Sequence, residues 1–253
     1  MKLLENIYKR LLRESMDDTS RLAAYVREEF GERRAVIYNP QELLDHIAEY
    51  TGSAQKYDLD NYTLREKLHK LTADTAVKGI INVAPPRNPC WGAWKVTAAA
   101  APGGPDIARI TYGLGYALSD GGVLMSDRGS MSKKAKAAWE RVYAGNKRQR
   151  LELDDVSLPV DKRRTPDFPG DDCKLYRGTS KLTPPEKNPH LQYAYKSQGW
   201  EKDRLHDLVA MHEMFMDEVE EEFGSAATKA AMRLLSFAES EFFSKHYEGP
   251  DND

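Results

Sequence analysis

The chain has 253 residues, of which 40% are hydrophobic, enough to bury the core of one large domain. Its 37 basic and 40 acidic residues leave a net charge of −3, so it lacks the overall positive charge of a general nucleic-acid binder. Its two cysteines exclude a disulfide-rich scaffold and a four-cysteine zinc site, and they favour a reducing, cytoplasmic compartment. Residues 1–15 lack the apolar core of a signal peptide, and no apolar run approaches the roughly 20 residues that span a membrane.

Helical spacing of apolar residues dominates residues 1–76, which we predict to form a helical N-terminal region. Leu22, Val26 and Phe30 lie four residues apart, as they would on one face of a helix, and Gly31 is expected to end that helix. The expected elements are helices at about 1–17, 18–30, 39–50 and 60–73, with one short strand at 35–38.

From Val77 onward, short apolar runs alternate with helical spacing. We expect strands at 77–83, 90–98 and 123–125 and helices at 105–119 and 132–144. Strands that alternate with helices predict a sheet with helices packed on it. The predicted fold class is therefore α/β (α+β), with a small central mixed sheet at 77–145 and helical additions at both ends of the chain.

The remaining residues divide into two regions. Residues 146–200 are rich in proline and charge, and we expect an irregular arm that offers a surface for a protein partner. Residues 201–248 return to helical spacing on either side of Gly224, which predicts a C-terminal helical hairpin.

The most chemically suggestive segment is the glycine turn at 98–105, between a predicted strand and a predicted helix. A helix start presents unpaired backbone N–H groups and the positive end of the helix dipole, and glycines let a phosphate approach closely. Gly103 and Gly104 therefore predict an anion site. The alternative is a plain tight turn, in which Gly104 caps the helix and Pro105 occupies its first position.

Four stretches of the chain resemble the central part of a GCN5-related N-acetyltransferase (GNAT), and most closely the divergent acetyltransferase-like domains of tailed-phage proteins. These stretches are residues 94–105, 107–114, 123–128 and 132–143. The turn has adjacent glycines where the family commonly spaces them, and strand 90–98 carries no carboxylate to act as a base. A GNAT-like fold that has lost catalysis is therefore an alternative to an active enzyme.

The resemblance implies acetyl-CoA as the cofactor and several residues that would bind it. The strand before the turn, here with Val96 and Ala98, would hold the pantetheine arm. A tyrosine on the last helix of the unit, here Tyr143, would be the general acid toward the leaving thiolate. The pyrophosphate would lie on Gly103, Gly104 and the N–H groups of Asp106 and Ile107.

Asp127 and Arg128 follow the third predicted strand of this unit and could orient a substrate. The alternative is an Asp–Arg pair that stabilises the turn before the next helix. Cys90 has no histidine close to it in the sequence, so we expect a small half-buried residue on its strand.

No metal site is predicted, because His206 and His212 lie six residues apart and so do not share a helix face. Short basic clusters at 147–150 and 162–164 could contact phosphate, but acidic residues separate them. Three functions follow: an acyl-CoA-dependent N-acyltransferase, a phage structural or host-interaction protein in the virion or host cytoplasm, and a nucleic-acid-binding accessory protein.

Overall fold

The computed structural model describes residues 22–47, 62–87, 89–126, 133–144, 150–156, 159–163, 165–173 and 189–246. The expected helix at 1–17 lies outside these residues, as do the predicted substrate residues Asp127 and Arg128. Within the described part of the chain, no helix is both long and apolar enough to cross a membrane.

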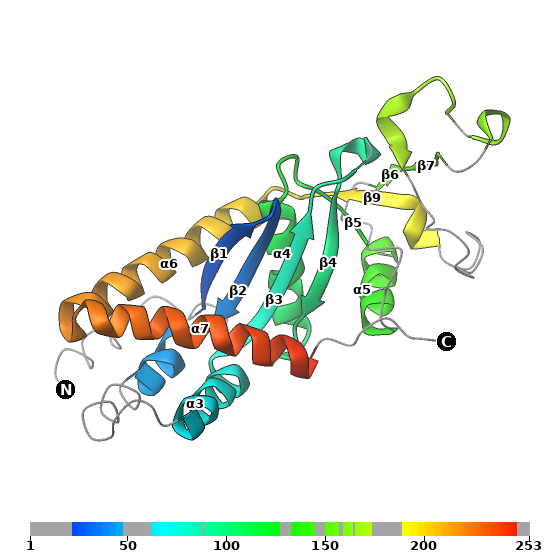
Figure 1. The fold of residues 1–253 in the computed structure, drawn as a ribbon. Helices are drawn as coiled ribbons and strands as arrows, with labels where there is room; N and C mark the ends of the chain where they lie inside the picture. The colour runs from blue at the N-terminus through cyan, green and yellow to red at the C-terminus, as the bar shows by residue number, and fades with distance from the viewer. Residues whose placement is uncertain are drawn as a thin grey trace.

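One mixed sheet of seven strands forms the centre of the molecule (Figure 1). Its spatial order is β1-β2-β3-β4-β5-β9-β6, and all neighbours are antiparallel except the parallel pair β4 and β5. The predicted mixed sheet is confirmed, and it extends beyond residues 77–145 in both directions. The strands are β1 (Ala23–Glu29), β2 (Glu32–Tyr38), β3 (Val77–Ala84), β4 (Trp94–Ala100), β5 (Val123–Ser126), β6 (Arg150–Glu152) and β9 (Tyr193–Lys196).

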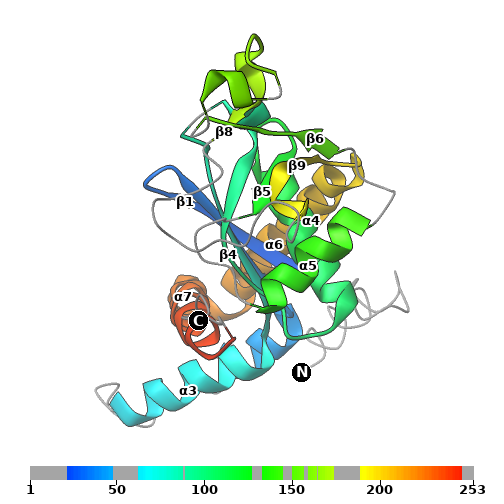
Figure 2. The same ribbon diagram turned by 90° about the vertical axis from the view of Figure 1, so that its right-hand side faces the viewer.

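Helices cover both faces of the sheet, which makes three layers (Figure 2). On one face lie α4 (Pro105–Leu118), α5 (Lys133–Ala144) and the first part of α6 (Trp200–Phe223). On the other face lie α3 (Tyr62–Thr75) and α7 (Ser225–His246), which pack against each other. The layers confirm the expectation that helices flank the sheet.

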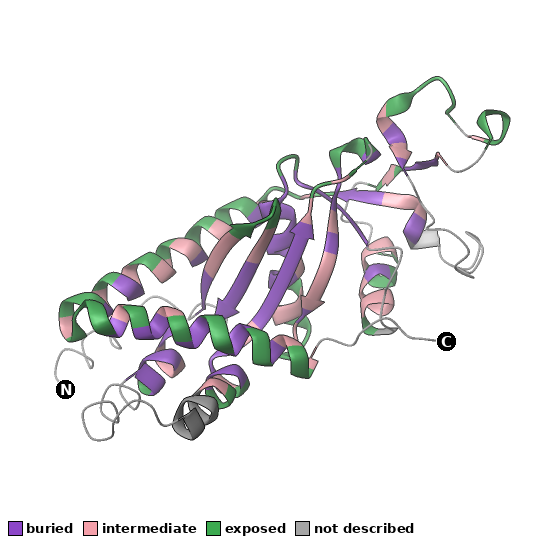
Figure 3. Cartoon of the chain, viewed as in Figure 1, coloured by how far each residue is buried: buried purple, intermediate pink, exposed green. Residues whose placement is uncertain are grey.

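Alternating residues of the central strands supply the two cores. Ile37 and Ile81 are buried on the α4 face, whereas their neighbours Val36 and Ile80 are buried against α3 and α7. A strand that is covered on both faces needs apolar residues at successive positions rather than at every second one. Figure 3 shows this as buried colour along most of β3.

The helix expected at 18–30 is wrong where the structure describes it, because residues 23–29 form strand β1. This strand pairs antiparallel with β2 from Ala23–Tyr38 to Glu29–Glu32. Phe30 and Gly31 form the turn with φ angles of 53° and 78°, and two positive φ angles are typical of a tight hairpin. Leu22 and Val26 fit a helix face by spacing, but here hairpin pairing and burial against α6 decide the structure.

The strand expected at 90–98 begins only at Trp94. Cys90, Trp91 and Gly92 all have positive φ angles, of 41°, 57° and 68°, so they form a tight turn instead. Cys90 is buried rather than half-buried and forms a disulfide with Cys173, across 83 residues of sequence. The cysteines are thus not the separate small residues that the sequence suggested.

In the part of 146–200 that the structure describes, the predicted irregular arm contains four short strands. Strands β6 and β9 complete one side of the main sheet. Strands β7 (Asp154–Asp155) and β8 (Asp172–Cys173) form a separate parallel pair in a lobe that projects beyond the sheet (Figure 1). At the end of the chain, α6 and α7 pack together on either side of Gly224, so the predicted helical hairpin is confirmed.

Candidate functional site

A groove of about 690 Å³ opens where β4 ends and α4 begins. We call it the α4 groove. Elements far apart in the sequence form its walls, because α5 and the last turn of α7 approach the glycine turn from opposite sides of the sheet. Its lining residues are Ala99, Ala100, Ala101, Pro102, Gly104, Pro105, Ala108, Tyr112, Lys134, Ala135, Ala137, Ala138, Arg141, Lys245 and His246.

The sheet itself creates room for this groove. The parallel ladder between β4 and β5 ends at the pair Val96–Ser126 in the described residues, while β4 continues to Ala100 paired only with β3. Beyond Val96, β4 therefore has no partner on its β5 side among the described residues. A strand edge carries free backbone donors and acceptors, which suit an extended ligand that contains amides.

The start of α4 lines the groove through Gly104, Pro105 and Ala108. Gly104 has φ 94° and ψ −175°, a conformation that is essentially restricted to glycine, and no side chain caps the helix. The first intrahelical bond runs from the Ala108 N–H to the Gly104 carbonyl at 3.0 Å. The N–H groups of Asp106 and Ile107 precede this bond and so have no partner within the helix, and the helix dipole favours an anion there.

Small residues keep the groove open. Seven of its lining residues are alanines, contributed by the end of β4, the first turn of α4 and one face of α5. Alanine is a strong helix former that fills little volume, so α5 stays regular while leaving space between itself and α4. The open space of the groove therefore follows from the small side chains that the sequence places along it.

The rim of the groove is cationic. Lys134 and Arg141 are exposed on α5, and Lys245 lies in the last turn of α7, where it pairs with Asp74 at 2.6 Å. Burial, together with the nearby charges of Lys245 and Lys134, holds the pKa of His246 below its usual range. His246 is thus neutral at pH 7, and the positive potential comes from the lysines, the arginine and the helix start.

Tyr112 is the tyrosine that lines the groove. Its ring meets that of Trp139 edge-on at 5.9 Å, which fixes its position between α4 and α5. Burial raises the pKa of Tyr112 to about 12. Its hydroxyl therefore stays protonated at neutral pH and can donate a hydrogen bond or a proton.

Of the predicted cofactor residues, Gly104 lines the groove, and the other five are not among its lining residues. Gly103 lies so close to Ile107 that a Cβ atom would meet Ile107 Cγ1 at 2.9 Å. Asp106 is exposed in the first turn of α4. Val96 is buried in the core beneath α4, and Ala98 lies opposite Asn82 on β3.

Tyr143, the predicted general acid, does not line the groove. It follows Arg141 by two residues, about 200° around α5, and so lies on a different face of the helix. Its ring packs 5.7 Å from that of Tyr193, and the Arg150 guanidinium lies 4.1 Å from its centre. The groove instead contains Tyr112, which sequence reasoning missed.

The missed cationic residues leave only a faint signal in the sequence. Lys134, Ala138 and Arg141 lie at helical spacing, and a stripe of small and basic residues on one helix face could have suggested an anion-binding wall. Nothing in the local sequence places Lys245 and His246 beside that stripe, because the packing of α7 brings them there.

Other candidate residues have packing roles. The Tyr38 hydroxyl lies 2.7 Å from His212 Nδ1, and His46 Nε2 lies 2.8 Å from the Thr75 hydroxyl. Within the basic clusters, Arg163 pairs with Asp172 at 3.8 Å. Among the described residues, no group of three His, Cys, Asp or Glu side chains could hold a metal ion.

Comparison of the chain with protein-family models, with curated proteins and with solved structures finds no match. The groove therefore has to be interpreted from its own chemistry.

Proposed function

We propose that this protein binds an acyl-coenzyme A in the α4 groove and transfers the acyl group to an amine. The observation that carries the proposal is a groove of about 690 Å³ that combines an uncapped helix start with the cations Lys134, Arg141 and Lys245. Coenzyme A carries several phosphates at one end and an extended amide chain at the other. The resemblance of residues 94–143 to GNAT proteins supports the same ligand.

Each part of this ligand has a matching part of the groove. The pyrophosphate would accept hydrogen bonds from the N–H groups of Asp106 and Ile107. The arginine and the lysines would neutralise the remaining phosphate charge. The pantetheine amides would lie along β4 beyond Val96, where the described pairing with β5 ends.

In the transfer step, the amine nitrogen attacks the thioester carbonyl carbon and the carbon–sulfur bond breaks. The amine releases a proton to water, and the coenzyme A thiolate takes up another. Tyr112 is the proposed donor of that proton, since it lines the groove and remains protonated at neutral pH. Its phenolate is then reprotonated from solvent.

The test uses two alanines of α5. Ala138→Leu fills the groove, whereas Ala144→Leu changes an exposed alanine that does not line it. The wild-type protein and Ala144→Leu should be stabilised by acetyl-CoA, by about 2.7 kcal/mol at 100 times the Kd, and Ala138→Leu should not. With spermidine as an amine acceptor, a thiol reagent should detect released coenzyme A for the first two proteins only.

The two readouts separate binding from catalysis. Stabilisation without release of coenzyme A for any of several amines would leave a binding protein that has lost its chemistry. Absence of stabilisation at millimolar acetyl-CoA would overturn the proposal as a whole.

A second candidate is a non-enzymatic interaction protein, of the structural or host-interaction kind found in phages. The observation that favours it is the lobe around β7 and β8, where Val160 is 60% exposed and Phe168 is 46% exposed. Exposed apolar side chains on a projecting lobe suit a protein partner. An interaction protein has no need of an open groove, so the acetyl-CoA titration also discriminates between the two.

A further inference from the structure

A second cavity, of about 450 Å³, lies at the opposite end of β4 from the α4 groove. It is bounded by the turn before β4, by β6 and by the lobe that carries β7 and β8. We call it the lobe pocket. The residues that matter for its chemistry are Trp91, Asp154, Thr165, Phe168 and Asp171.

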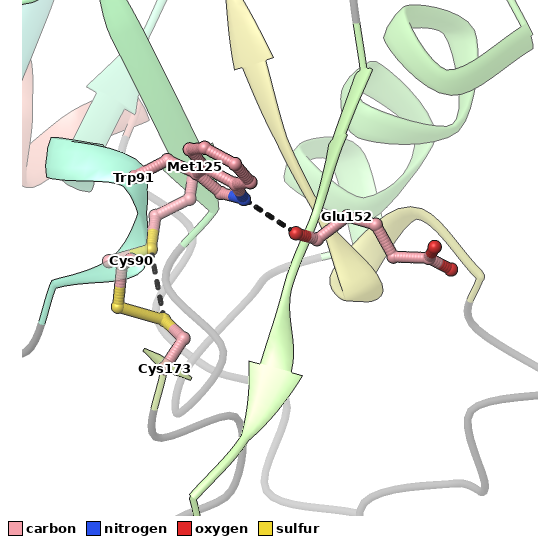
Figure 4. The surroundings of a disulfide bond; sticks show 5 residues. All are labelled: Cys90, Trp91, Met125, Glu152 and Cys173. Atoms are coloured by element: carbon pink, nitrogen blue, oxygen red, sulfur yellow. Dashed lines mark hydrogen bonds between the residues drawn. A yellow bond between two sulfur atoms is a disulfide. The ribbon is translucent and has the colours of Figure 1, made fainter. Parts of the chain in front are cut away.

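Covalent and hydrogen-bonded links hold the walls of the lobe pocket together (Figure 4). The disulfide joins Cys90, next to Trp91, to Cys173, two residues after Asp171. The Trp91 indole N–H donates to the Glu152 carbonyl at 2.6 Å, which ties the turn to β6. The sulfur of Met125 lies 3.8 Å from that of Cys173 beneath the turn. The pocket is therefore formed before any ligand arrives.

One carboxylate oxygen in this pocket lacks a partner. Asp171 is 5% exposed, and its Oδ2 accepts a hydrogen bond from the Thr165 hydroxyl at 2.5 Å. Its Oδ1 is buried and has no hydrogen-bond partner among the residues that the structure describes. The Thr165 backbone N–H donates to Asp154 at 3.1 Å, so Thr165 holds both carboxylates in place. A buried carboxylate oxygen without a donor is unfavourable, and a bound cationic donor would satisfy it.

Two aromatic rings stand at the mouth of the same pocket. The centres of the Trp91 and Phe168 rings lie 5.1 Å apart at an interplanar angle of 40°. Their side chains are 39% and 46% exposed, so their faces are accessible to a ligand. Aromatic faces attract organic cations, and a carboxylate behind them attracts an N–H donor.

We propose that the lobe pocket binds the primary ammonium group of an organic amine, beside the contacting rings of Trp91 and Phe168 and against Asp171. Arg150, which also lines the pocket, leaves this position free because its guanidinium lies over the ring of Tyr143 and donates to the Tyr143 carbonyl. The site is separate from the α4 groove and does not depend on acyl transfer.

The experiment is a calorimetric titration of the wild-type protein with cadaverine, an alkyl diamine, at neutral pH. Asp171→Asn should weaken binding about tenfold or more, the loss expected for one charge-assisted hydrogen bond. Phe168→Ala should weaken it about threefold, as expected for one exposed cation–π contact. The matched control Asp167→Asn removes an exposed carboxylate of the same lobe that does not line the pocket, and it should bind like the wild type.

Three results would overturn the proposal. They are no saturable binding of cadaverine at tens of millimolar, equal affinity for Asp171→Asn and the wild type, and equal weakening by Asp167→Asn. Should Asp171→Asn fail to fold, the affinity of Phe168→Ala for cadaverine decides. The Phe168 side chain is half-exposed, so we expect its removal to leave the fold intact. Acetyl-CoA binding measured on the same variants reports on the α4 groove independently.

Discussion

Gly104 is the residue whose backbone conformation sets the direction of the helix start toward the α4 groove. A Cβ atom at this position would meet nothing within 4 Å, so space does not require glycine. The backbone conformation requires glycine, because a residue with a side chain adopts φ 94° and ψ −175° only at a cost of about 1–3 kcal/mol. Gly104→Ala should therefore lower the free energy of unfolding by that amount in denaturant titrations.

Gly121 provides the matched control for this substitution. A Cβ there would meet only Val123 Cγ2, at an ordinary 3.9 Å. Gly121→Ala should leave stability within about 0.5 kcal/mol of the wild type. Equal stability of Gly104→Ala and Gly121→Ala would contradict the conformational role assigned to Gly104.

Desolvated tyrosines give the protein a specific weakness at high pH. Burial raises the pKa of Tyr112 to about 12 and raises those of Tyr38 and Tyr195 as well. In the unfolded chain these hydroxyls ionise near pH 10, whereas in the folded protein they stay protonated. The stability that they contribute is therefore fully present below pH 10 and is lost as the pH rises toward 12.

Tyr112→Phe isolates the contribution of one of these residues. The variant should lose stability less steeply than the wild type between pH 10 and 12, as measured by denaturant titration at each pH. Parallel curves for the two proteins over this interval would show that the Tyr112 hydroxyl is not desolvated.

At the scale of secondary structure, an ion cluster fastens α7 to the strands beneath it. Glu239 on α7 is 3% exposed, and its Oε1 accepts hydrogen bonds from Arg27 on β1, at 2.8 Å, and from Arg34 on β2. Neutralising this carboxylate removes the buried charge that both arginines share, although Arg27 also pairs with Glu29 and Arg34 also donates to Asn82 Oδ1. Glu239→Gln should cost about 2 kcal/mol of unfolding free energy.

The exposed Glu241, two residues further along α7, gives the comparison. Glu241→Gln should change stability by less than about 0.5 kcal/mol in the same denaturant titration. If Glu239→Gln and Glu241→Gln have the same free energy of unfolding, the ion cluster contributes no more stability than a surface charge does.

The disulfide between Cys90 and Cys173 fastens the projecting lobe to the main sheet. A cross-link that closes a loop of 83 residues stabilises a protein by about 4 kcal/mol in the chain-entropy account. Reduction should therefore lower stability and speed proteolysis within 150–173. Thiol titration of the unreduced, denatured protein should find no free cysteine, and two free thiols would contradict the disulfide and support a reducing compartment.

The sequence predicts those elements whose signals are local. Pro105 after two glycines marks the start of α4, and Gly224 marks the boundary between α6 and α7, as the structure has them. Strand β1 was mistaken for helix because Leu22, Val26 and Phe30 share a helical spacing. Pairing with β2 overrides that spacing, and such pairing depends on contacts that a local pattern does not contain.

At the scale of the whole molecule, the candidate site is assembled from three distant segments. The glycine turn was predictable, because glycines before a helix carry a local signal. Lys134, Arg141 and Lys245 were not, since only the packing of α5 and α7 around the sheet brings their charges to the turn. The same reason explains why the sequence predicts Tyr143 and does not indicate Tyr112: the face that a helix turns toward a groove is set by tertiary packing.

Recognition of the phosphates of coenzyme A by the α4 groove is the central prediction for this protein. The direct measurement is a calorimetric titration of the wild-type protein with acetyl-CoA and, separately, with acetyl-pantetheine, which has the same thioester but no phosphate. We predict saturable binding of acetyl-CoA that weakens with added salt, and binding of acetyl-pantetheine that is at least about tenfold weaker. Equal affinity for both ligands, or no binding of acetyl-CoA at millimolar concentration, would contradict the account.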